Sequence, residues 1–182
     1  MRPTNTVVII SDEHNRDIAG CYGDATVRTP NLDRMAREGA LFANAYTNSP
    51  VCVPARASFA TGRYPHQIGA WDSVTPYTGT PRGWGARLRD AGHEVVAIGK
   101  LHFRSSDDDN GFSRELVPMH VHKGIGWLSS LLRNPPAVIE TSDMSTSIGA
   151  GETAYTNYDR EVTRLACEWI VEAANRNHDQ PW

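Results

Sequence analysis

The sequence has few cysteines and no long apolar run. Its three cysteines, Cys21, Cys52 and Cys167, are odd in number, and none has the Cys-x-x-Cys or Cys/His spacing of a structural zinc site. This composition excludes a disulfide framework. The early apolar run at residues 7–10 is too short to span a bilayer, and no small-residue cleavage site follows it. We therefore expect no membrane association, a mature protein that starts near Met1, and a cytoplasmic location.

Basic charge is also not in excess. The formal net charge is −3 and the isoelectric point is near 6.1, whereas a nucleic-acid-binding domain normally carries a basic face. No internal repeat or low-complexity tract is visible. Hydrophobic residues make up 40% of the 182 positions, which suits one globular domain with a sizeable core. We expect no nucleic-acid partner.

Two short apolar runs end in polar residues. Residues 6–11 are rich in β-branched side chains, which is typical of a strand buried on both faces, and they lead directly into Asp12 and Glu13. A similar run at residues 95–98 leads into the polar residues 99–102. In open α/β sheets, ligands bind beyond the carboxyl ends of the strands. The pattern predicts an α/β fold with a mostly parallel central sheet flanked by helices.

Helices are predicted between and after these strands, over residues 29–39, 54–61, 83–91 and 158–175. The first has Thr29 as N-cap, Pro30 in its first turn and Gly39 as its stop. The last has an apolar stripe at helical spacing, which predicts a helix packed on the sheet; the stripe comprises Val162, Leu165, Ala166, Trp169, Ile170 and Ala173. We interpret residues 105–111 as a polar loop and 116–153 as irregular.

One motif carries chemistry. The spacing Cys52-x-Pro54-x-Arg56, followed by Thr-Gly-Arg at residues 61–63, resembles the modification signature of the type I sulfatases, which belong to the alkaline-phosphatase-like superfamily. Residues 28–33 (Arg-Thr-Pro-Asn-Leu-Asp) resemble a common sulfatase phrase, and residues 99–103 resemble the same stretch of bacterial choline-sulfatase-like enzymes. The similarity covers most of residues 5–112 and returns weakly in the helix after Tyr155.

The resemblance implies a sulfuric ester hydrolase. In that family a formylglycine-generating enzyme oxidises the motif cysteine, here Cys52, to an aldehyde that hydrates to a geminal diol. One hydroxyl attacks the sulfur of a sulfate ester, and the second then collapses to the aldehyde and releases sulfate. A serine has no second hydroxyl for that release.

The resemblance also implies a metal site. By family position Asp12 and Glu13 are ligands, together with the formylglycine made from Cys52. Hard oxygen donors suit Ca²⁺, with Mg²⁺ or Mn²⁺ as alternatives. A divalent ion stabilises negative charge on the transferring group.

The remaining site residues are cations. Cys52 precedes a helix, whose N–H groups and dipole favour anions, and Arg56 lies one helical turn away. By family position Arg56 holds the formylglycine hydroxyl. Lys100 and His102 alternate after a strand, so we expect both to face the cleft, bind sulfate oxygens and assist proton transfer.

Other ligands that the family needs, a later Asp with Asn or His and a later Lys and His, have no candidates in residues 113–182. We therefore expect residues 1–182 to be the N-terminal part of a sulfatase catalytic domain, inactive alone, which forms a homo-oligomer or associates with its missing C-terminal part. Two alternatives stay open. One is a phosphonate monoester or phosphodiester hydrolase of the same superfamily, and the other is a non-catalytic fragment that binds an anion or a partner.

Overall fold

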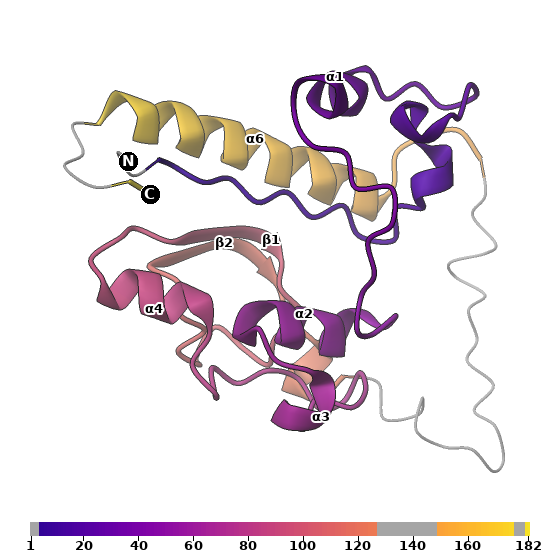
Figure 1. Ribbon diagram of the computed structural model, residues 1–182. Helices are drawn as coiled ribbons and strands as arrows, with labels where there is room; N and C mark the ends of the chain where they lie inside the picture. The colour runs from indigo at the N-terminus through magenta and orange to yellow at the C-terminus, as the bar shows by residue number, and fades with distance from the viewer. Residues whose placement is uncertain (1–3, 127–148, 177–180) are drawn as a thin grey trace, which may run out of the picture. The chain divides into compact units, whose positions relative to one another are not determined.

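The computed structural model describes residues 4–126, 149–176 and 181–182 (Figure 1). The chain divides into two compact units. One consists of Met1–Thr6 with Asn48–Trp182, and the other is Val7–Thr47. Among the described residues, no helix is long and apolar enough to cross a bilayer.

The larger unit contains a two-stranded parallel sheet. Strand β1, Val96–Lys100, pairs with β2, Arg114–Met119. The first strand confirms the prediction at residues 95–98, and the helices and parallel strands confirm the α/β class. The second strand lies where we predicted irregular structure, so that prediction is wrong there. This strand contains Pro118, and because proline donates no ladder hydrogen bond, the segment lacks the usual sequence pattern of a central strand.

A bulge accommodates this proline. Ile98 pairs with Leu116 and Lys100 pairs with Met119, so Gly99 alone faces two residues of β2, Val117 and Pro118. Gly99 has φ +94° and Val117 has φ +42°. The first angle costs glycine little, but left-handed backbone is a true outlier for a β-branched residue. The bulge therefore places one strained residue in β2.

Helix α6, Ala154–Asn175, packs against both strands. Figure 1 shows the strand pair between α6 and the helices α2 and α4. The predicted apolar stripe is confirmed: Trp169 and Ala173 are buried, the rest of the stripe is half-buried, and Cys167 beside it is exposed. The helix begins before the predicted residue 158 because the Thr153 side chain accepts a hydrogen bond from the Thr156 N–H, which caps the helix at that point.

Three further helices surround the core of this unit: α2 (Cys52–Thr61), α3 (Pro65–Ile68) and α4 (Trp84–Asp90). Helices α2 and α4 confirm two predictions, and α3 was not predicted. The buried cluster comprises Ala57, Ala60, Ala70, Tyr77 and Phe103. Small alanines on α2 let the aromatic rings approach its backbone closely. Gly62 ends α2 with φ +67°, a left-handed conformation that glycine adopts readily at the end of a helix.

The smaller unit, Val7–Thr47, contains two 3-10 turns (Arg16–Ile18 and Gly20–Tyr22) and α1 (Pro30–Glu38), which confirms the first predicted helix. The strand predicted at residues 6–11 is wrong, because these residues have no strand structure. The side chains of Val7, Val8, Ile9 and Ile10 are 51–78% exposed. An apolar run favours burial, but a strand also needs a neighbour with which to form a hydrogen-bond ladder.

Candidate active site

Cys52 is the first residue of α2 and is half-buried. The preceding N-cap, Val51, is extended and provides no side-chain cap for the helix. The Ser49 hydroxyl instead accepts a hydrogen bond from the Val51 N–H, at 3.3 Å. The side chain of Cys52 thus lies at a helix N-terminus, where backbone N–H groups favour an anion. The predicted position of Cys52 at the start of a helix is confirmed, although the helix begins at Cys52 itself and not at residue 54.

His102 reaches this helix from the end of β1. The N–H groups of Leu101 and His102 both donate to the Met119 carbonyl, at 3.1 and 2.8 Å. Nδ1 of His102 lies 3.2 Å from Sγ of Cys52. The expected strand-like alternation of Lys100 and His102 is wrong, because β1 ends at Lys100 and His102 has φ +52°. A left-handed turn, rather than the strand pleat, directs this imidazole to the thiol.

Arg56 forms a second contact between α2 and the end of β1. Its Nη1 donates a hydrogen bond to the carbonyl oxygen of Lys100, so a guanidinium from α2 lies at the last residue of β1. The structure therefore brings Cys52, Arg56, His102 and the Lys100 backbone together. The roles inferred from resemblance, Arg56 on the formylglycine hydroxyl and Lys100 on a sulfate oxygen, stay predictions.

Tyr158 is a further residue near this site, and it was not among the residues predicted from the sequence. It lies in the first turns of α6, and its hydroxyl donates to the Val117 carbonyl at 2.7 Å. Burial raises the pKa of Tyr158, the Asp159 carboxylate raises it further, and the Arg56 cation opposes both. The phenol is therefore a stable donor at neutral pH, and Arg56 is near enough to influence it. A tyrosine at a helix start gave no signal of this role.

Asp12 and Glu13 lie in the smaller unit, in an exposed turn. The Ser11 hydroxyl and Nδ1 of His14 are 3.1 Å apart across this turn. Glu13 has φ +58°, a conformation that non-glycine residues adopt at turns and functional sites. That Asp12, Glu13 and Cys52 bind one metal stays a prediction.

No group of three or more His, Cys, Asp or Glu side chains placed to hold a metal ion occurs within residues 4–126, 149–176 and 181–182. The hard oxygen donors of Asp12 and Glu13 fit part of a Ca²⁺ or Mg²⁺ shell, which needs six or more ligands. The described residues do not complete that shell.

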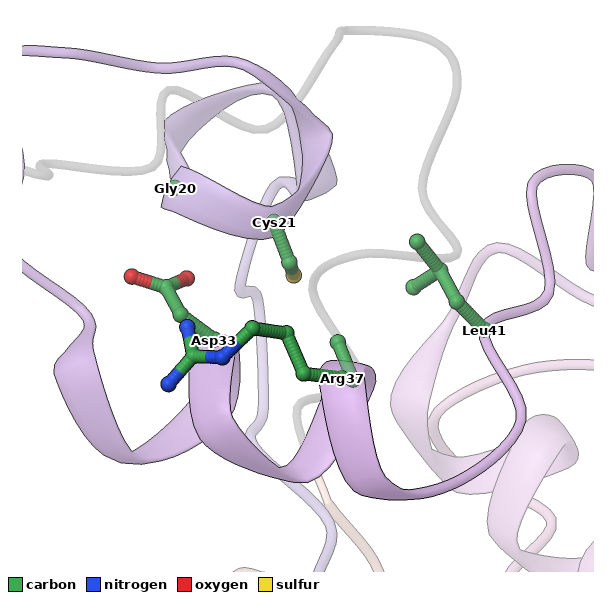
Figure 2. A pocket seen from close by; sticks show the side chains of 6 residues that line it. Gly20, Cys21, Asp33, Arg37 and Leu41 are labelled. Atoms are coloured by element: carbon green, nitrogen blue, oxygen red, sulfur yellow. The ribbon is translucent and has the colours of Figure 1, made fainter.

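A pocket in the smaller unit is lined by Gly20, Cys21, Asp33, Ala36, Arg37 and Leu41 (Figure 2). None of the predicted site residues lines it. The Asp33 carboxylate already accepts a hydrogen bond from the Thr29 hydroxyl at 3.0 Å, which fixes the start of α1. This pocket has no role in the predicted chemistry.

Comparison with known proteins agrees with the motif. The family model described as sulfatase matches residues 4–182. The choline-sulfatase of Rhizobium meliloti is 31% identical over 186 residues, which cover 98% of this chain and 36% of that protein. The chain thus spans little more than a third of that relative's length.

Two solved structures are similar in fold. A structure determined in complex with its substrate, D-glucosamine-2-N,6-O-disulfate, has a TM-score of 0.58 and 32% identity, and the match covers 63% of this chain and 23% of that one. The phosphonate monoester hydrolase of Agrobacterium radiobacter also has a TM-score of 0.58, with 23% identity over 91% of this chain and 36% of that one. At that identity the second likeness concerns the fold alone.

Proposed function

The chain belongs to the sulfatase family, and from this premise we propose that the protein hydrolyses sulfate monoesters at Cys52. The observation that carries the proposal is the 3.2 Å approach of His102 Nδ1 to Cys52 Sγ at the N-terminus of α2. It joins the modifiable cysteine to a proton-transfer group and to helix N–H groups that favour an anion.

Cys52 is proposed to act as formylglycine. The thiol sulfur then stands in for the aldehyde-derived oxygens, which are attached to the same Cβ. When hydrated, this group supplies one hydroxyl that attacks sulfur and displaces the alcohol. The second hydroxyl then loses its proton and re-forms the carbonyl, which breaks the C–O bond to the sulfated oxygen and releases sulfate. A formylglycine-generating enzyme is therefore a required partner during maturation.

His102 has the geometry to exchange a proton with the group at position 52. A general acid or base must lie within hydrogen-bond reach of the proton it moves, and Nδ1 is at that range. The backbone N–H of His102 is held by the Met119 carbonyl, so the imidazole approaches from a fixed turn. We assign His102 to proton transfer at the nucleophile.

Arg56 and Lys100 supply positive charge next to this centre. The guanidinium of Arg56, on α2, donates a hydrogen bond to the backbone carbonyl of Lys100, the last residue of β1, so the guanidinium is held beside the residue that carries the second cation. A sulfate ester is an anion whose charge shifts during transfer, and preorganised cations stabilise that charge without reorganising. We assign Arg56 to holding the formylglycine hydroxyl and Lys100 to binding a sulfate oxygen.

A divalent metal belongs to the same proposal, with Asp12, Glu13 and position 52 as ligands. Ca²⁺ is the preferred ion, and Mg²⁺ and Mn²⁺ are the alternatives. It would supply charge neutralisation at the transferring group. Because the described residues do not complete its ligand shell, no step is assigned to it.

The substrate proposed is a small organic sulfate ester. The relative from Rhizobium meliloti is a choline-sulfatase, and one similar structure holds a sulfated glucosamine. Choline sulfate and glucosamine 6-sulfate are therefore the first esters to test, with an aryl sulfate as a general probe.

The test has two parts. The complete protein is produced in a host that contains the formylglycine-generating enzyme, and the tryptic peptide of residues 38–56, which contains Cys52 alone among the cysteines, is weighed. The same preparation is assayed on the three sulfate esters and on phenyl phosphonate. We expect the aldehyde mass and faster turnover of a sulfate ester. An unmodified cysteine in that host, or a preference for the phosphonate, contradicts the proposal.

A further inference from the structure

Two residues of α6 act on the bulge between β1 and β2. The hydroxyl of Tyr158 donates to the carbonyl of Val117, the strained residue of β2, at 2.7 Å. One turn later, Val162 lies against Gly99, the residue of β1 opposite the bulge. A Cβ built on Gly99 would lie 3.1 Å from both γ-carbons of Val162. Thus α6 contacts both sides of the bulge, by a hydrogen bond on β2 and by close packing on β1.

The bulge is adjacent to the active-site turn. Met119 follows the bulge by one residue and pairs with Lys100. Its carbonyl accepts both the Leu101 and the His102 N–H groups. The backbone conformation of His102 therefore depends on where the bulge places Met119, and the distance from His102 to Cys52 depends on that conformation.

Val117 would not adopt φ +42° without a constraint. Left-handed backbone is unfavourable for a β-branched residue, and such outliers persist where the surroundings hold them, often next to functional sites. The phenol of Tyr158 is the constraint that the structure provides at the Val117 carbonyl. A bulge also redirects the residues that follow it.

We propose that Tyr158 is a positioning residue, which holds the Val117 carbonyl and thereby fixes the bulge from which His102 reaches Cys52. The part of this inference that concerns catalysis rests on the proposed sulfatase activity. The part that concerns the geometry of His102 does not. Tyr158 acts through the β2 backbone, and no direct contact with substrate is assigned to it.

The test uses Tyr158→Phe in the complete protein, because it removes only the hydroxyl. Tyr155→Phe is the matched control, since Tyr155 lies one turn earlier in α6 with 63% of its surface exposed. Amide hydrogen exchange is measured at residues 101 and 102, whose N–H groups bond to Met119. We expect exchange there to be roughly tenfold faster in Tyr158→Phe, with no change in the buried part of α6 around Ala173 and none in the control.

The kinetic readout is the division between kcat and KM. Misplacing a proton-transfer group lowers kcat with little effect on binding, so we expect kcat to fall roughly tenfold at nearly constant KM. Adding Val117→Gly to Tyr158→Phe should recover part of both losses, because glycine adopts φ +42° without the strain that Tyr158 opposes. A merely structural tyrosine would gain nothing from that second change.

The outcomes separate the two proposals. Unchanged exchange at 101 and 102, or a uniform increase throughout the larger unit, overturns the positioning role. Failure of Val117→Gly to recover any loss overturns it as well. If exchange responds as expected but the complete, aldehyde-bearing wild-type protein cleaves no sulfate ester, the positioning role stands and the proposed function fails.

Discussion

The sulfur of Cys52 and Nδ1 of His102 lie 3.2 Å apart although 50 positions separate them in the sequence. One belongs to the first turn of a helix and the other to a left-handed turn after a strand. The Arg56–Lys100 hydrogen bond joins the same helix and the same strand end. The candidate active site is therefore a junction between α2 and β1, and changes on either side of it should have separable effects.

The nucleophile is tested by changing each cysteine. Cys52→Ala should abolish turnover because no aldehyde is formed. Cys52→Ser should attack once and keep the sulfuryl group, since a single hydroxyl offers no route for release, and the peptide of residues 38–56 should gain the mass of one SO3 group. Cys21→Ala and Cys167→Ala are the controls and should keep activity. Loss of activity in either control, with Cys52 intact, would contradict this assignment.

Removing the imidazole should affect the chemical step. We expect His102→Ala to lower kcat by about 10²–10⁴, the usual contribution of a general acid or base. His122→Ala is a matched control, because His122 lies in an exposed 3-10 turn (His122–Gly124). The measurement is the kcat of both variants from steady-state kinetics. If His122→Ala lowers kcat as much as His102→Ala does, the assignment of His102 to proton transfer is contradicted.

Arg56→Lys tests the bond between helix and strand. A lysine keeps the charge but lacks the planar fork that reaches the Lys100 carbonyl, so we expect a loss of about 1–2 kcal/mol in the free energy of unfolding. Urea unfolding measures it. Arg87→Lys, at an exposed position of α4, should change stability by less than about 0.5 kcal/mol. If the two variants unfold at the same urea concentration, the Arg56 bond has no measurable effect on stability.

Alanine substitutions at two glycines distinguish the cost of backbone strain from the cost of steric contact. Gly69 has φ +70° with open space at its missing Cβ, whereas Gly99 has φ +94° and would contact Val162. Gly69→Ala should therefore cost about 1 kcal/mol from backbone conformation alone, and Gly99→Ala about 2–4 kcal/mol because overpacking is added. Thermal unfolding of both variants gives the comparison. Equal costs would mean that α6 moves aside freely.

Acid stability should depend on the Arg89–Asp109 pair, whose Nη2 and Oδ2 atoms are 2.7 Å apart. The hydrogen bond from Arg89 holds the pKa of Asp109 below its ordinary value of 3.8. A lowered carboxyl pKa contributes stability that is present above 3.8 and is lost as the pH falls through the lower folded value. Asp109→Asn should thus be slightly less stable than wild type at pH 7 and equal to it in strong acid. Because Asp109 is largely exposed, the difference should be small and should shrink with added salt.

The helices were predictable because their signals are local. Thr29-Pro30 and Gly39 delimit α1, and the stripe on α6 marks its buried face before any partner is known. Strands were predicted less well, because a strand requires a partner that may lie anywhere in the chain. Residues 6–11 have the composition of a strand without its ladder, and β2 forms its ladder in spite of Pro118.

The sequence by itself determined the family, through the Cys52-x-Pro54-x-Arg56 motif, and the placement of Cys52 and Arg56 one turn apart on a helix. Both the motif and the helical placement depend only on the spacing of residues that are close together in the sequence. Only the tertiary structure decided how His102 meets Cys52. That contact depends on a bulge with Val117 in left-handed backbone and on a tyrosine 41 positions away that holds its carbonyl. Such a conformation is unfavourable locally and exists only because packing between distant segments stabilises it.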